Sequence, residues 1–259
     1  MKFLLTVIMT LFISINAFAQ TKSELKAIKA AEELKLAYEA KDAGNHTLSV
    51  IHFKKACDNN IIEGCYNLAV MHKEGKPFTL KKMYSYKLYA LAKKLRDNSP
   101  NPNYEHITAV YELSCDVGMV PACVDLAGIY AEGKSVAKDE LKAAKLYSKA
   151  CDDGVKRACV NAGNIYSNHK IYDKAAIEWQ KACNTYGDGK SCLNLEKLFK
   201  RTCDNGNYEN CFNLANLYRY GAIEVKVDIQ EAKSLYKLAC SNDYKTACAS
   251  LNNLSAKGY

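Results

Sequence analysis

The chain has 259 residues, of which 49% are hydrophobic and 25% are charged. This balance is typical of a folded protein with a full apolar core and excludes a disordered chain. The formal net charge of +8 is spread along the sequence, and the arginines lie far apart without a nucleic-acid-binding motif, so we expect no nucleic-acid partner.

The first nineteen residues have the pattern of a signal peptide. Lys2 precedes an apolar run from Phe3 to Ile15, and Ala17-Phe18-Ala19 fits a signal-peptidase site. A membrane anchor is the alternative interpretation, but the apolar run is shorter than a membrane-spanning helix needs. We therefore predict a signal peptide at 1–19, a mature chain at 20–259 with no membrane span, and a secreted or periplasmic location.

Helical patterns fill the region that follows. Residues 22–41 are rich in Ala, Leu, Lys and Glu, which predicts a strong helix. Its apolar positions share one face: Ala27, Ala30, Ala31, Leu34 and Tyr38. Further helices are predicted at about 47–57, at 64–74, from a cap at Thr79 to about Asn98, and from the break at 99–103 to Cys115. Runs of alternating β-branched residues are missing from the sequence, so we expect an all-α fold.

The twelve cysteines fall into six local pairs. These are Cys57/Cys65, Cys115/Cys123, Cys151/Cys159, Cys183/Cys192, Cys203/Cys211 and Cys240/Cys248. Five pairs enclose seven residues and the fourth encloses eight. Repetition at this scale indicates a repeat architecture.

The sequence around each pair repeats as well. An aromatic ring stands four residues before each first cysteine: Phe53, Tyr111, Tyr147, Trp179, Phe199 and Tyr236. Small residues usually stand eight residues and one residue before it, so one helix face is small, aromatic and small. Asp or Asn, often with Gly, follows in the link, and a new apolar stripe begins at the second cysteine. The repeated unit is therefore predicted to be two helices joined by a tight turn, with a cysteine on each side of the turn.

Two readings of the paired cysteines compete. Structural zinc sites favour two to four residues between neighbouring cysteine ligands and gather four ligands, whereas these pairs enclose seven or eight residues. Two antiparallel helices joined by a short turn bring the flanking side chains together, which suits a disulfide. We therefore predict a disulfide in each pair, consistent with an oxidising compartment.

Spacing between the pairs shows two irregular places. Cys115 stands 50 positions after Cys65, which leaves room for an additional helix within an insertion at 76–110. Cys203 stands only 11 positions after Cys192, so the repeat is shortened at 193–202 and one helix must carry both cysteines. We expect a right-handed αα solenoid that forms a single domain over 20–259.

Several of these features resemble a known family. Leu-Ala follows the second cysteine, Tyr and Gly stand seven and ten residues after it, and the strings KAAKLYSKAC and DDGVKRAC complete the unit. The pattern resembles Sel1-like repeats, relatives of the tetratricopeptide repeat. With a signal peptide and one disulfide per repeat, the chain is similar to the Helicobacter cysteine-rich protein family. The resemblance implies penicillin-binding or β-lactamase activity.

The residues themselves do not supply a motif for that activity. Ser-x-x-Lys occurs four times, at Ser23/Lys26, Ser135/Lys138, Ser167/Lys170 and Ser234/Lys237, but no Lys-Thr-Gly or Lys-Ser-Gly accompanies it. The five histidines lack a His-x-His or His-x-x-x-His spacing. We therefore name no catalytic residue and expect no metal and no cofactor, and hydrolysis of β-lactams is implied by the resemblance alone.

A polar side chain stands two residues after the second cysteine in most units. These residues, called the polar ladder below, are Asn67, Asp125, Asn161, Asn194 and Asn213, and Ser250 interrupts the series. Equal offsets fall on one face of a repeat array, and an amide both donates and accepts hydrogen bonds. The ladder is either a face that binds a peptide, peptidoglycan fragment or protein partner in a superhelical groove, or a set of braces within each first helical turn.

Overall fold

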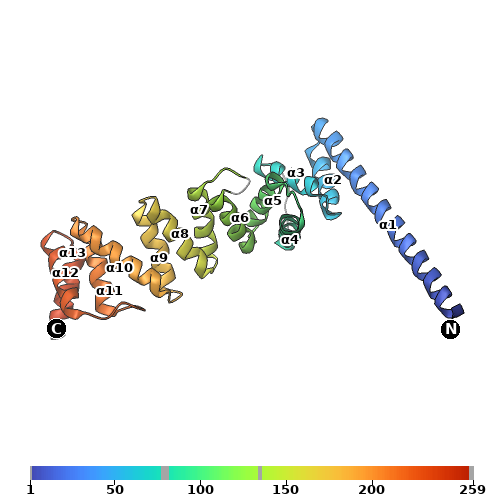
Figure 1. Ribbon diagram of the computed structural model, residues 1–259. Coiled ribbons are helices and arrows are strands. Elements are labelled where there is room, and N and C mark those ends of the chain that lie inside the picture. Colours follow the sequence, from blue (N-terminus) through green and yellow to red (C-terminus); the bar gives the residue numbers. More distant parts are fainter. Residues whose placement is uncertain (1, 77–81, 134–135, 257–259) are drawn as a thin grey trace. The chain divides into compact units, whose positions relative to one another are not determined.

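The computed structural model describes the backbone of residues 2–76, 82–133 and 136–256, and the side chains of 21–76, 84–133 and 136–256. The chain divides into two compact units, called the first unit (Met1–Leu126) and the second unit (Ala127–Tyr259). Within the described residues both units are built of α-helices, and the one β feature is an isolated bridge between Ala222 and Val225. The expected all-α repeat solenoid is confirmed (Figure 1).

Within its described residues the first unit contains five complete helices. They are α1 (Lys2–Asp42), α2 (His46–Asp58), α3 (Ile62–Lys73), α4 (Lys82–Asn98) and α5 (Tyr104–Asp116). The boundary between the units falls within α6 (Val120–Glu132). In this unit α2 packs against α1 and α3, and α5 packs against α3 and α4. Helix α4 lies within the stretch 76–110 that was predicted to be an insertion, and the predicted cap at Thr79 lies outside the described residues.

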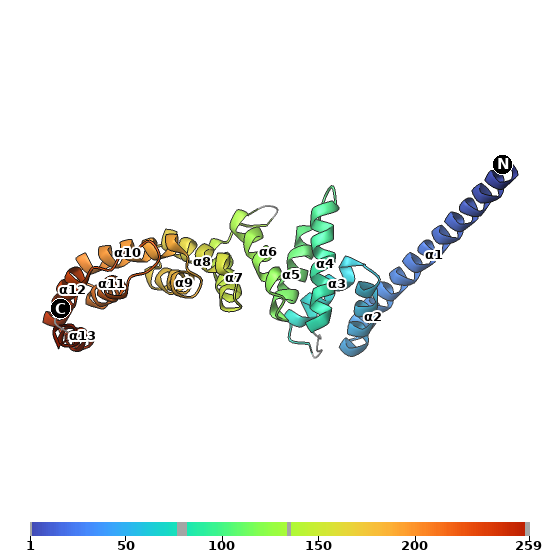
Figure 2. The ribbon, with the colours of Figure 1, turned by 90° about the horizontal axis from the view of Figure 1, so that it is seen from below.

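Seven further helices follow in the described part of the second unit. They are α7 (Glu140–Asp152), α8 (Lys156–Asn168), α9 (Tyr172–Asn184), α10 (Gly189–Asp204), α11 (Tyr208–Tyr220), α12 (Ile229–Ser241) and α13 (Lys245–Ala256). Each of these helices packs against the next one along the chain, which is the arrangement of a repeat array (Figure 2). Helix α10 carries both Cys192 and Cys203, as their spacing predicts.

The core is formed by the small and aromatic residues that the repeats place before each first cysteine. The six aromatic rings that precede the first cysteines are all buried, with exposed fractions from 0% to 9%. The small residues beside them are also buried: Ser49, Ala56, Ala143, Ala150, Ala175, Ala182, Ala232 and Ala239. Small side chains let neighbouring helices approach closely, and the rings fill the space between them. Burial of these rings removes apolar surface from water, which stabilises the packing of each hairpin against its neighbours.

All twelve cysteines form the six predicted disulfides. Each bond joins the end of one helix to the start of the next, with Cα atoms 4.7–4.9 Å apart. The bonds are Cys57–Cys65, Cys115–Cys123, Cys151–Cys159, Cys183–Cys192, Cys203–Cys211 and Cys240–Cys248. The described residues contain no free cysteine, so the disulfide prediction is confirmed and the zinc alternative is wrong.

The surroundings of the bridges differ in two details that the spacing does not predict. Cys240 and Cys248 of the last bridge are half-buried, whereas the other ten cysteines are 0% to 4% exposed. Cys123 Sγ lies 3.7 Å from the Cys115 carbonyl oxygen, and Cys248 Sγ lies at the same distance from the Cys240 carbonyl oxygen. A sulfur in a disulfide has no proton to donate, so these are packing contacts and the pairing stands.

One hairpin turn shows how the link between two bridged helices closes. After α7, Gly154 takes a positive φ of 99°, and the N–H of Val155 donates to the carbonyl of Ala150 at 3.0 Å. Glycine adopts this backbone conformation without the steric cost that a Cβ brings. The turn therefore brings Cys151 and Cys159 together at the end of the hairpin.

The buried face of α1 differs from the expected one. Ala30, Ala37 and Ala40 are buried, whereas Ala27 and Ala31 are exposed. The prediction was wrong there because helical periodicity alone does not say how much of a helix has a partner. Helix α2 pairs with the C-terminal part of α1, so that part determines which face is covered.

Side chains 1–20 lie outside the described residues, and the signal peptide at 1–19 stays a prediction. Among the residues searched, no helix is both long enough and apolar enough to cross a membrane. The six disulfides are typical of an oxidising compartment.

Candidate functional site

The polar ladder lies in the first two turns of the helices that follow the hairpin turns. Asn67 belongs to α3, Asp125 to α6, Asn161 to α8, Asn194 to α10 and Asn213 to α11. The disulfides fix these turns, because the second cysteine stands two residues before each ladder residue. The ladder residues differ in what their side chains contact, and that difference decides which of them can bind a partner.

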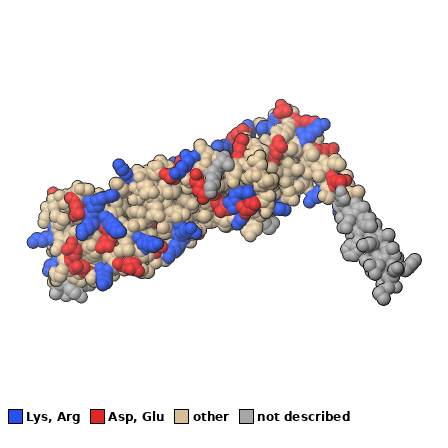
Figure 3. Space-filling model, in the orientation of Figure 1, with Lys and Arg blue, Asp and Glu red and all other residues tan. Residues whose placement is uncertain are grey.

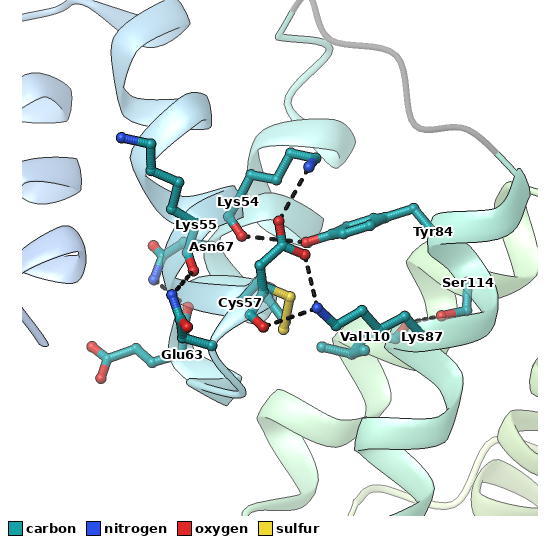
Figure 4. Close-up of a disulfide and its surroundings, with 12 residues drawn as sticks. Lys54, Lys55, Cys57, Glu63, Asn67, Tyr84, Lys87, Val110 and Ser114 are labelled. Carbon is teal, nitrogen blue, oxygen red and sulfur yellow. Dashed lines mark hydrogen bonds and ion pairs between the residues drawn. A yellow bond between two sulfur atoms is a disulfide. The ribbon is translucent and has the colours of Figure 1, made fainter. Parts of the chain in front are cut away.

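Asn67 is a structural brace in the first unit. Its side chain is 4% exposed, and its Nδ2 donates to the Glu63 carbonyl and to the Tyr38 hydroxyl, both at 2.9 Å. The Tyr38 hydroxyl in turn donates to Glu63 Oε1 at 2.7 Å. Figure 4 shows Asn67 beside Glu63 and near the Cys57 disulfide. Asn67 therefore ties α3 to α1, and its amide N–H groups are engaged within the chain.

Asp125 is engaged by the inserted helix α4. Its Oδ2 accepts from the Tyr89 hydroxyl at 3.1 Å and lies 3.3 Å from Arg96 Nη1. Burial raises the pKa of Tyr89, and the negative charge of Asp125 raises it further. Burial would lower the pKa of Arg96, but the hydrogen bond to Asp97 and the neighbouring Tyr111 and Asp125 raise it above its ordinary value. Arg96 therefore stays charged, and Asp125 acts as its counter-ion.

In the second unit some ladder side chains, called open below, have no hydrogen-bond partner among the described residues. Asn213 donates from Nδ2 to Asn210 Oδ1 at 3.3 Å, within its own helix. Asn161 and Asn194 are half-exposed, and neither side chain has a hydrogen-bond partner among the described residues. Each of these two amides can therefore donate and accept toward a partner from outside the chain.

A second series of polar residues, five positions after the second cysteine, braces neighbouring repeats. The Trp179 Nε1 donates to Asn164 Oδ1 at 3.1 Å, and the Tyr236 hydroxyl donates to Asn216 Oδ1 at 2.6 Å. A Cβ on Gly163 would lie 2.5 Å from the Trp179 ring, so only glycine fits beside it. Sequence reasoning missed this series, although an amide five residues after the cysteine, followed by a ring in the next repeat, would have been the signal.

Carboxylates one residue after the first cysteine form ion pairs with lysines of a later helix. Asp58 Oδ1 lies 2.9 Å from Lys87 Nζ of α4, and Asp152 Oδ1 lies 2.5 Å from Lys181 Nζ of α9. Figure 4 shows Tyr84 and Lys87 of α4 pointing toward the end of α2. Sequence analysis assigned these aspartates to turns alone, because the lysines stand 29 residues away. These pairs position helices and do not form a reactive site.

The Ser-x-x-Lys motifs do not bring a serine and its lysine into contact in the described residues. Ser23 and Ser234 are exposed and Ser167 is half-buried, and none of them contacts the lysine of its Ser-x-x-Lys motif. Ser135 lies outside the described residues. Where side chains are described, no group of three His, Cys, Asp or Glu residues could hold a metal ion. The predicted absence of a cofactor stays a prediction.

Comparison with known proteins matches the repeat pattern. The Sel1 repeat family model matches residues 41–61, 62–97, 120–155 and 211–244. A search of curated proteins found no match. The helices match a protective antigen of uropathogenic Escherichia coli with 19% identity and a TM-score of 0.35. That match covers 88% of this chain and 57% of the antigen, so the chain spans little more than half of that protein.

Two further solved structures are similar at the same level. A Sel1 repeat protein from Oxalobacter formigenes is 19% identical, with a TM-score of 0.33, over 83% of this chain and 88% of that one. An immunity protein from Pseudomonas aeruginosa is 20% identical, with a TM-score of 0.35, over 66% of this chain and 74% of that one. At these identities and TM-scores the solved structures say nothing about what this chain binds.

Proposed function

Because the chain is a Sel1-repeat solenoid, we propose that it is an exported scaffold that binds a protein or peptide partner through the first turns of α8 and α10. The observation that carries this proposal is the pair of open ladder amides, Asn161 and Asn194. The ladder residues Asn67, Asp125 and Asn213 have partners within the chain. Polar groups that recur at one position and lack partners are suited to contacts with another chain.

The disulfides support this function by holding the surface rigid. Cys159 and Cys192 anchor the turns that carry Asn161 and Asn194 to the preceding helices. A surface that is ordered before binding loses less conformational entropy when a partner docks. The partner can then gain affinity from a few hydrogen bonds and apolar contacts.

A peptidoglycan fragment is an alternative ligand, because its stem peptide presents the same amide groups as a protein. Penicillin binding or β-lactam hydrolysis, implied by the resemblance to the Helicobacter cysteine-rich proteins, has no support from the described serines and lysines. A chromogenic cephalosporin tests that activity directly, with the wild-type chain and with each Ser-x-x-Lys serine replaced by Ala. Turnover that one replacement abolishes would establish the hydrolase and identify its nucleophile.

The binding proposal is tested with peptides selected on the oxidised wild-type protein from a random phage-displayed library. We expect Asn161→Ala with Asn194→Ala to weaken peptide binding at least about tenfold, the loss of one or two good hydrogen bonds. The matched control is Asn168→Ala with Asn184→Ala, which removes two exposed amides of α8 and α9 that also lack partners among the described residues. Equal affinities of the two variants would refute a role for the ladder.

A further inference from the structure

Helix α10 presents a continuous basic face to solvent. Lys190, Asn194, Lys197 and Arg201 stand at intervals of four, three and four residues, which places them in one row along the helix. Lys200 flanks the row, and the four cations are exposed. This surface is called the α10 basic face below.

The face is continuous because α10 serves two repeats at once. Cys192, Leu195, Phe199 and Cys203 are 0% to 6% exposed and occupy the opposite side of the helix. The usual pair of helices between two disulfides is replaced here by this single helix. From Lys190 to Arg201 the row is about 17 Å long at 1.5 Å per residue.

The positive charge of this face is not balanced within the described residues. Lys190, Lys197 and Lys200 form no ion pair or hydrogen bond there, and Arg201 lies over the Tyr172 ring at 4.3 Å. Figure 3 shows Lys and Arg side chains gathered over the C-terminal helices on the face in view, with Asp and Glu side chains among them.

Carboxylates also lie on or against α10, and two of them already bond to other groups. Glu196 Oε1 accepts from the Tyr218 hydroxyl at 2.8 Å. Asp188 caps α10 through the N–H of Ser191 at 2.9 Å and lies 3.8 Å from Lys156 Nζ. Glu224 lies against Gly189 at the start of α10, and Asp204 ends the helix. The middle of the row, from Asn194 to Arg201, therefore keeps its excess of positive charge.

We propose that the α10 basic face binds an acidic peptide segment of a partner protein. This inference rests on the proposed scaffold function and names the chemistry of the partner. Carboxylates of the segment pair with Lys190, Lys197 and Arg201, and the open amide of Asn194 bonds to the peptide backbone between them. An extended segment of about five residues matches the 17 Å row at roughly 3.3 Å per residue. Opposite charge also accelerates the encounter between the two chains.

The test uses a fluorescein-labelled hexaglutamate peptide and a hexaglutamine peptide of equal length, with binding measured by fluorescence anisotropy on the full oxidised chain. We expect the wild-type protein to bind the glutamate peptide at least about tenfold more tightly than the glutamine peptide at low ionic strength. The preference should decrease as salt rises from about 0.05 M to about 0.5 M, because screening weakens exposed ion pairs.

The decisive variant is Lys190→Glu with Lys197→Glu and Lys200→Glu, three exposed positions at which a folded helix tolerates Glu. Its matched control, Lys145→Glu with Lys237→Glu and Lys245→Glu, changes the net charge equally on α7, α12 and α13, where these lysines are also exposed and lack partners in the described part of the chain. We expect the first variant to abolish the preference for glutamate and the second to retain most of it. Circular dichroism checks that both variants stay helical.

Three results would overturn the inference. Equal losses in the two triple variants would mean that net charge alone attracts the peptide. A wild-type chain without a preference for glutamate would refute an acidic partner but leave the scaffold proposal standing, since Asn161→Ala with Asn194→Ala tests that proposal on selected peptides. Binding to vesicles that contain anionic lipid, without binding to the peptide, would assign the α10 basic face to a membrane surface instead.

Discussion

The two units differ in how they use the ladder position, because only the second unit contains ladder side chains without a partner among the described residues. In the first unit Asn67 and Asp125 are held by Tyr38 of α1 and by Tyr89 and Arg96 of α4. In the second unit Asn161 and Asn194 have no such neighbour among the described residues. Helix α4 is an additional helix, and its Tyr89 and Arg96 engage Asp125, whereas no helix supplies such groups to Asn161 or Asn194 among the described residues. A repeated residue therefore takes its role from the helix beside it, and its place in the repeat does not decide between brace and binding group.

The largest expected effect comes from the disulfides that pin α10. Replacing Cys203 and Cys211 with Ala should destabilise the second unit by about 2–3 kcal/mol, the chain-entropy contribution of a loop of this length. The Cys57/Cys65 pair has the same sequence separation, so its removal is the matched control and should act on the first unit. Hydrogen exchange of the oxidised and variant proteins locates each loss. Unchanged protection across α10 and α11 in the first variant would contradict the view that this disulfide stiffens the helix.

A smaller effect separates the two kinds of ladder residue. Asn67→Ala should destabilise the protein by about 1–3 kcal/mol, because it removes two part-buried hydrogen bonds and leaves the Tyr38 hydroxyl oxygen without its Asn67 donor. Asn194→Ala should change stability by less than about 0.5 kcal/mol, as for other surface positions without partners. Urea unfolding of both variants provides the measurement. Similar losses would show that the two units do not differ in this respect.

The smallest expected effect is a loss of folding stability at acidic pH. Burial would raise the pKa of Asp58, but its hydrogen bonds with Lys87 and Lys54 outweigh burial and lower the pKa below its ordinary value. A lowered pKa in the folded state contributes stability above the unfolded pKa of roughly 4, and this contribution is lost as the pH falls through the folded pKa. Asp58 is about a third exposed, so we expect less than about 1 kcal/mol.

Asp58→Asn provides the check on this ion pair. The variant should be less stable than wild type at neutral pH, and the difference should shrink as the pH falls through the lowered pKa of Asp58. Thermal unfolding at neutral pH and at a series of lower pH values measures this difference. A difference that stays constant with pH would mean that Asp58 acts through its shape and not through its charge.

The sequence by itself determined the helices, the core and the disulfides. Apolar periodicity, small residues and the spacing of the cysteines are local properties. They depend only on the residues of one hairpin. Phe53, Tyr147 and Trp179 are buried where the pattern places them, and the six cysteine pairs form as predicted, from Cys57–Cys65 to Cys240–Cys248. The single helix α10, which carries both Cys192 and Cys203, also follows from the short distance between these cysteines along the chain.

Tertiary structure alone decided which polar side chains have a hydrogen-bond or ion-pair partner on another helix. Asn67 and Asn194 are equivalent in the sequence, and they differ because the Tyr38 hydroxyl bonds to Asn67, while the Asn194 side chain has no such partner among the described residues. The ion pair between Asp58 and Lys87 and the bond between Trp179 and Asn164 likewise join residues of different hairpins. Such contacts depend on how neighbouring helices pack, and the apolar periodicity of one helix does not identify the polar partner on the next helix.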